Sequence, residues 1–144
     1  MKDFVVSRLL GGMGNQMFEY AFARALSLRN GMELYLDACA LDPKRHTRFS
    51  LGAFNVGAPF VDAERKSLVI TPRFEIKRKL YKALKIPYRL SPTHIREKSF
   101  AFDPSVLSVK NSCYAEGLWQ SEKYFSDFAD AIRADFAFRD AERL

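Results

Sequence analysis

Apolar and polar positions in the first quarter of the chain follow two different periods. Residues 3–10, DFVVSRLL, form a short apolar and β-branched run that stops at two glycines, which is typical of a buried strand. From Asn15 to Arg29 apolar residues recur every three or four positions, and Asn30-Gly31 supplies a left-handed stop, so this segment predicts a helix. Residues 32–37, MELYLD, predict a second strand that ends at an aspartate. A strand, turn, helix and strand in this order predict a parallel pair of strands.

Weaker signals of the same kind continue to the C-terminus. Arg73–Leu90 holds seven Lys or Arg residues against one Glu and predicts a basic amphipathic helix that stops before Pro87. Asp103-Pro104 predicts the start of a short helical turn, and residues 112–120 predict a third buried strand. A final helix is expected from Ser121, whose hydroxyl would cap it. The alternation predicts an α/β fold, a three-layer Rossmann-like domain with a mostly parallel sheet.

Composition limits the organisation and the cellular setting. With 144 residues, 48% of them hydrophobic, the chain is sufficient for one core, so we expect one domain over residues 1–144. It holds no uncharged apolar run of about 18 residues, the length that spans a bilayer. Cys39 and Cys113 stand far apart without metal-ligand spacing, so we expect buried thiols in a reducing, cytoplasmic setting. The net charge of +6 favours anionic partners.

The chemistry is concentrated in residues 11–16, GGMGNQ, where the first strand meets the first helix. Unpaired N–H groups and the positive end of the dipole at a helix start favour an anion, and glycines let it approach closely. An Asn15 amide at this position could donate to a phosphate or sugar oxygen that the backbone cannot reach. The candidate binding residues are therefore Gly12, Gly14, Asn15 and Gln16. A turn with a purely structural role is the alternative.

Two nucleotide-binding patterns fit this turn less well. The sequence reads G-x-G-x-x-M, and Asp37 follows at roughly the ~20-residue offset expected of a ribose-binding acid in a dinucleotide site. Met17, however, replaces the third glycine, which normally lets helix and strand pack closely. A P-loop is excluded because no Gly-Lys-Ser/Thr follows.

Two later segments also carry candidate residues. Trp119 and Gln120 end the third predicted strand at the carboxyl edge where α/β folds bind ligands, so they are candidates for stacking on a sugar or binding its hydroxyls. Simple packing is the alternative. His94, in the segment HIRE, is interpreted as a surface or loop residue.

Five segments, in the same order, resemble the α-1,2-fucosyltransferases of glycosyltransferase family 11, in particular bacterial members. GGMGNQMFEYAFARAL matches the signature Gly-Gly-x-Gly-Asn-Gln-x-Phe-x-Tyr-Ala that opens these enzymes. The segments LYLD, FSLGAFNV, FAFDPSVL and YAEGLWQSEKYFSD follow in the family's order. The resemblance extends over nearly the whole chain.

This resemblance implies an inverting transfer of L-fucose from GDP-β-L-fucose to the 2-hydroxyl of a galactoside, without a metal or other cofactor, on a GT-B type fold. It implies that Asn15 is the catalytic residue, beside the donor's phosphates or fucose, with clearance from Gly12 and Gly14. The family's His-x-Arg-Arg-x-Asp motif does not occur in these 144 residues. We therefore expect the N-terminal, largely acceptor-side half of the enzyme, without the donor-binding C-terminal domain, and an incomplete catalyst.

The expected partners are GDP-fucose and a galactoside-containing oligosaccharide or lipid-linked glycan. The basic helix predicted within Arg73–Leu90 has two interpretations: an exposed, solvated helix without a partner, or a helix that rests on anionic head groups in peripheral contact with the inner membrane. We expect no nucleic-acid partner, because the interleaved aromatic and glycine pattern of an RNA-binding sheet is missing. A non-catalytic module that binds a nucleotide or another anion remains open as a different class of function.

Overall fold

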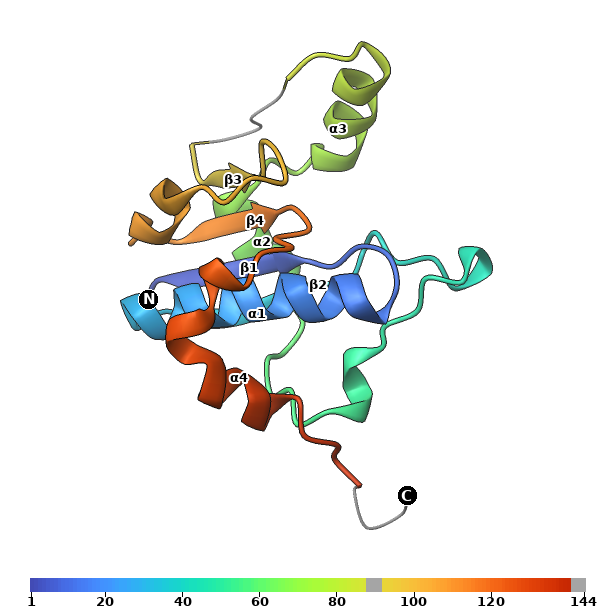
Figure 1. Cartoon of the computed structure of the whole chain (residues 1–144). Helices are drawn as coiled ribbons and strands as arrows, with labels where there is room; N and C mark the ends of the chain where they lie inside the picture. Colours follow the sequence, from blue (N-terminus) through green and yellow to red (C-terminus); the bar gives the residue numbers. More distant parts are fainter. Residues whose placement is uncertain (88–91, 141–144) are drawn as a thin grey trace.

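The computed structural model describes residues 1–87 and 92–140, and within them four strands form one sheet (Figure 1). The strand order is β2-β1-β4-β3, and all neighbours run parallel. The strands are β1 (Phe4–Arg8), β2 (Glu33–Asp37), β3 (His94–Arg96) and β4 (Cys113–Glu116). The α-helices are α1 (Met13–Asn30), α2 (Ala63–Val69), α3 (Phe74–Ala83) and α4 (Ala129–Asp135). Short 3-10 helices are η1 (Pro43–Arg45), η2 (Leu51–Ala53), η3 (Pro104–Ser108), η4 (Glu122–Tyr124) and η5 (Ser126–Phe128).

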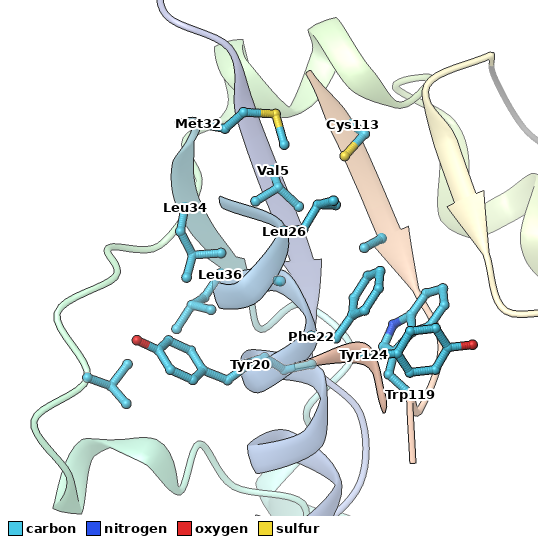
Figure 2. Close-up of a cluster of buried hydrophobic side chains, with 14 of the residues drawn as sticks. Val5, Tyr20, Phe22, Leu26, Met32, Leu34, Leu36, Cys113, Trp119 and Tyr124 are labelled. Carbon is cyan, nitrogen blue, oxygen red and sulfur yellow. The ribbon is translucent and has the colours of Figure 1, made fainter. Parts of the chain in front are cut away.

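Successive side chains of β1 point to opposite faces of the sheet, and both sets include apolar residues. Helices therefore pack on both faces. Val5 packs under α1 in the main core cluster, with Phe22 of that helix (Figure 2). Phe4 and Val6 point to the other face, where they meet Phe74 of α3. Helix α4 lies outside α1, against its small residues. The predicted α/β, Rossmann-like fold with a parallel sheet is confirmed.

The first supersecondary unit agrees with the sequence pattern. Strand β1 pairs in parallel with β2, from Phe4 opposite Glu33 to Arg8 opposite Asp37. Helix α1 ends where Gly31 adopts the left-handed conformation, with φ of 63°. The helical turn after Asp103 is also confirmed, since its side chain accepts a hydrogen bond from the Ser105 N–H.

Three expectations about individual elements need correction. His94 is not a surface residue, because it is buried in β3, a three-residue edge strand that the sequence pattern did not reveal. The third predicted strand is shorter than residues 112–120, since β4 ends at Glu116. The final helix does not begin at Ser121, because two 3-10 turns precede α4. The basic helix expected to stop before Pro87 is found as α3, which ends at Ala83, and residues 88–90 of that segment lie outside the described residues.

Among the described residues, no helix combines the length and the apolar character needed to cross a bilayer.

A buried ionic cluster lies beneath the carboxyl ends of the strands, on the face covered by α2 and α3. The Arg8 guanidinium, at the end of β1, is 1% exposed and contacts a Glu75 carboxylate oxygen at 2.6 Å. Its Nε lies 3.9 Å from Glu116 at the end of β4, and Glu116 also contacts Arg78 at 3.3 Å and His94 at 2.9 Å. The cluster ties α3 to the two central strands.

Removing the central cation of this cluster should destabilise the fold. An Arg8→Met variant keeps side-chain volume but leaves the buried Glu116 carboxylate with one cation fewer, so the free energy of unfolding should fall by about 3–5 kcal/mol. The matched control is Arg45→Met, whose exposed pair with Asp42 should contribute no more than about 1 kcal/mol. Urea denaturation followed by circular dichroism measures both. Equal losses in the two variants would contradict the role given to Arg8.

Candidate functional site

The glycine-rich turn lies at the carboxyl edge of the sheet, between the end of β1 at Arg8 and the start of α1 at Met13. Gly11 adopts φ of +67°, and a Cβ there would lie only 2.5 Å from the Asn15 amide nitrogen. Gly11 is therefore the glycine that the backbone itself requires. Gly12 and Gly14 are exposed, and a Cβ on either would meet nothing within 4 Å.

The start of α1 carries no negative charge. Gly12 is its N-cap, no side chain caps the helix, and the first turn contains no acidic residue. The N–H groups at a helix start have no intrahelical partner, and the dipole is positive there. This end of α1 therefore favours an anionic ligand over a cation.

Asn15 and Gln120, far apart in the sequence, meet at this helix start. The Gln120 amide nitrogen donates to the Asn15 side-chain oxygen over 3.0 Å. In this arrangement the acceptor of Asn15 is used within the protein, and its amide nitrogen has no hydrogen-bond partner among residues 1–87 and 92–140. The Asn15 amide nitrogen is thus a hydrogen-bond donor held in place in the first turn of α1. Both residues were candidates from sequence, but their pairing was not predicted.

Gln16 faces inward and is fully buried. Its amide nitrogen donates to the carbonyl oxygens of Gly11, at 3.0 Å, and Arg48, at 2.7 Å, while its oxygen accepts from the Ser50 N–H at 2.9 Å. Both ends of the amide are engaged by the backbone. The geometry therefore gives Gln16 a positioning role, joining the glycine turn to the segment before η2.

Glu19 supports the turn from one helical turn further along α1. It is fully buried, and one carboxyl oxygen accepts from the Leu10 N–H at 2.9 Å. Its other oxygen, Oε1, has no hydrogen-bond partner within residues 1–87 and 92–140. Burial raises the pKa of Glu19 to about 9, so the group is a neutral acid at pH 7. Sequence reasoning missed this residue, because a glutamate in a helix ordinarily faces water.

Trp119 packs in the core and does not stack on a free surface. Its ring lies parallel to Phe22 with centroids 3.9 Å apart and meets Tyr124 edge-on (Figure 2). It is 1% exposed, which favours the packing alternative over contact with a sugar. The Glu97 carboxylate, just after β3, accepts from the N–H groups of Leu118 and Trp119 and so fixes the loop that carries Gln120.

Asp37 has the wrong surroundings for a ribose-binding acid. It is buried, and its carboxylate receives hydrogen bonds from the Tyr114 hydroxyl at 2.6 Å and the Cys39 N–H at 3.0 Å, with Lys66 at 2.7 Å. Burial alone would raise the pKa of Asp37, but these donors lower it below its ordinary value. A carboxylate this fully engaged disfavours the dinucleotide-binding alternative.

A basic groove opens beside the glycine turn at the same edge of the sheet. It has a volume of about 550 Å³, and its wall includes Leu10 just before the turn. Its charged lining consists of Arg78, Lys82, Lys85, Arg96 and Lys98, together with Glu116. Because Glu116 lies against Arg8 and Arg78, the balance of charge in this groove is positive and favours phosphate or carboxylate groups.

The two cysteines differ in exposure. Cys113 is buried, whereas Cys39 is exposed, contrary to the expectation that both are buried. Although the residue as a whole is exposed, partial desolvation of its sulfur, together with the neighbouring Asp37, raises the pKa of Cys39 to about 11, so it remains a thiol at pH 7. The described part of the chain holds no group of three or more His, Cys, Asp or Glu residues placed to bind a metal ion.

The state of Glu19 can be tested through the pH dependence of stability. The folded pKa of about 9 lies above the ordinary value of 4.5, so the contribution of Glu19 is complete below pH 4.5 and is lost progressively up to about pH 9. A Glu19→Gln variant lacks this titration. Urea denaturation should give it wild-type stability near pH 5 and a growing advantage over wild type by pH 8. A stability difference that does not change with pH would show that Glu19 is ionised in the fold.

Comparison with known proteins gives one informative match. The chain is 33% identical over 136 residues to an alpha-1,2-colitosyltransferase of Escherichia coli, an alignment that covers 93% of this chain. The alignment covers 45% of the relative, so the chain spans about half the length of that protein. No family model and no solved structure matches the chain. Over nearly its whole length, the chain is therefore related to part of a glycosyltransferase.

Proposed function

We propose that this chain is the N-terminal part of an inverting glycosyltransferase that transfers a deoxy-L-hexose from a GDP-sugar to the 2-hydroxyl of a galactoside. The observation that carries the proposal lies at the start of α1, where the Gln120 amide occupies the side-chain oxygen of Asn15 and the Asn15 amide nitrogen has no hydrogen-bond partner among the described residues. The similarity to an enzyme named for an α-1,2 linkage supports the same regiochemistry.

The chemistry requires stabilisation of the charge that develops on the departing nucleotide diphosphate. In this proposal Asn15 donates to a donor oxygen, while the uncapped N–H groups of α1 and the space around Gly12 and Gly14 admit the phosphates. Fixed donors cost little reorganisation when charge develops, which is why they lower the barrier. The basic groove next to Leu10 extends the positive surroundings along the same edge.

Of the other candidate residues, one is proposed to contact the substrate directly and two to act indirectly. Gln120 orients Asn15 and is open to the ligand, so it remains a proposed substrate-binding residue. Gln16 and Trp119 are assigned indirect roles: Gln16 fixes the turn and Trp119 fixes the loop before Gln120. No metal or other cofactor is proposed, because amide and helix-end donors supply the required positive potential.

The identity of the sugar is the finer part of the proposal. The family resemblance in the sequence favours L-fucose, whereas the matched relative is named for colitose, which is L-fucose without its 3-hydroxyl. Both sugars keep the L-galacto ring and the same leaving group. A site built to hydrogen-bond the 3-hydroxyl would reject colitose by about 10⁴–10⁵, because a buried polar group would be left unpaired.

The proposed setting is the cytoplasm, with an oligosaccharide or lipid-linked glycan as acceptor. The second candidate function is a non-catalytic module that binds a nucleotide or another anion. The uncapped helix start and the basic groove would serve such a module equally well. In this proposal the chain is part of a longer protein, here called the parent protein. Catalysis by the parent protein distinguishes the two candidate functions.

The test is a transfer assay with the parent protein and with residues 1–144 alone. Each is given GDP-fucose or GDP-colitose with lactose as acceptor, with and without EDTA, and the product is analysed by mass spectrometry and linkage by NMR. The parent should form an α-1,2-linked product from at least one donor, unaffected by EDTA, while the chain alone shows no turnover. GDP binding without transfer from either donor would support the non-catalytic module instead.

A further inference from the structure

The second helix layer leaves an aliphatic face uncovered. Ile76, Leu80 and Leu84 follow one another at intervals of four residues, so they lie on one side of α3 and its C-cap. They are 68%, 55% and 58% exposed. Contiguous exposed apolar surface of this kind marks an interaction site more often than a random surface does.

The opposite side of α3 is anchored to the protein, so the aliphatic face cannot turn inward. Phe74 is buried against Val6 and Tyr114, and Arg78 contacts Glu116 at 3.3 Å. Figure 1 shows α3 at the periphery of the fold, away from α1 and α4. The exposed stripe therefore belongs to a helix whose opposite side is held against the protein.

Lysines border the stripe on both sides. Lys77 lies three residues before Leu80, and Lys79 lies three residues after Ile76, so each is a neighbour of the stripe on the helix surface. Both are exposed. Lys82 and Lys85 continue the positive charge toward the basic groove. The surface is thus apolar along its middle and cationic along its rims.

We propose that α3 is an interfacial helix that docks on an anionic lipid bilayer. The stripe of Ile76, Leu80 and Leu84 enters the boundary between head groups and acyl chains. Lys77 and Lys79 extend their aliphatic stems along the stripe and place their ammonium groups among lipid phosphates. An anionic bilayer offers an apolar layer for the aliphatic stripe and negative head groups for the lysines on its rims, along the length of a single helix. This proposal goes beyond sugar transfer and does not depend on it.

Vesicle co-sedimentation of the 144-residue chain tests the proposal. Phosphatidylglycerol–phosphatidylcholine vesicles should bind the chain at low ionic strength, and pure phosphatidylcholine vesicles should not. A Leu80→Ser variant should bind about tenfold more weakly, because the transfer of a leucine side chain out of water is lost. The matched control is Leu68→Ser on α2, also 55% exposed, which should bind as wild type does.

A second variant tests the charge. Lys77→Gln/Lys79→Gln keeps the stripe and should reduce binding to the anionic vesicles, and added salt should have the same effect. Equal recovery in the supernatant with and without anionic lipid would overturn the proposal. Equal binding to neutral vesicles, or equal losses in Leu68→Ser and Leu80→Ser, would overturn it as well.

Protein occupants of the stripe give different results. Sedimentation equilibrium of the chain without lipid should show a monomer; a dimer abolished by Leu80→Ser would assign the stripe to a second copy. The vesicle assay is repeated with the parent protein, which should also bind. Binding by the chain but not by the parent would show that another part of the parent covers the stripe.

Discussion

Two side chains inside α1 hold the turn on which the candidate site depends. Gln16 bonds to the Gly11 carbonyl, and Glu19 accepts from the Leu10 N–H, so the backbone between β1 and α1 is fixed from beneath on both sides of its sharpest bend. Because Gly11 has a positive φ and packs tightly against Asn15, the bend in turn fixes where Asn15 lies. The position of the proposed donor is therefore a consequence of buried amide and carboxyl groups that never meet a ligand.

The ionic groups at this edge of the sheet fall into two sets. One set is buried and paired within the protein, and the other lines the surface where a ligand would bind. The contacts among Arg8, Glu75 and Glu116, like that between Asp37 and Lys66, pair charges of opposite sign beneath the sheet edge. The lysines of α3 and the groove point outward, where anions can reach them. The surface at this edge is net positive, because several of its acidic groups are paired with cations inside the protein.

The parts of the fold that the sequence predicted are those with a strong local period. Helix α1 and strands β1 and β2 follow directly from apolar spacing and from the Gly31 stop. Strand β3 was not predicted, because His94 and Arg96 are polar residues in a short segment. The pairing of this segment with β4 and the contact of His94 with Glu116 are long-range interactions that no local pattern indicates. Helix α2, not predicted at all, is one short segment capped by Asp62 and held by Val69.

The candidate site was predictable in composition but not in geometry. The glycines and Asn15 were evident as a motif, whereas the pairing of Asn15 with Gln120 brings together residues 105 positions apart. The inward orientation of Gln16 depends on carbonyl groups at residues 11 and 48, which no local pattern specifies. Glu19 is recognisable only once the helix is placed on the sheet, because its burial follows from packing.

The central claim is that Asn15 acts on the donor sugar-nucleotide, and the kinetics of Asn15→Ala in the parent protein test it most directly. Loss of one fixed donor to developing charge should lower kcat by roughly 100- to 1,000-fold, or about 2.7–4 kcal/mol, in a protein that retains its wild-type melting temperature. The matched control is Asn111→Ala, exposed in the loop before β4, which should keep wild-type kcat. Near-normal turnover by a folded Asn15→Ala variant would contradict the account and leave the glycine turn a structural feature only.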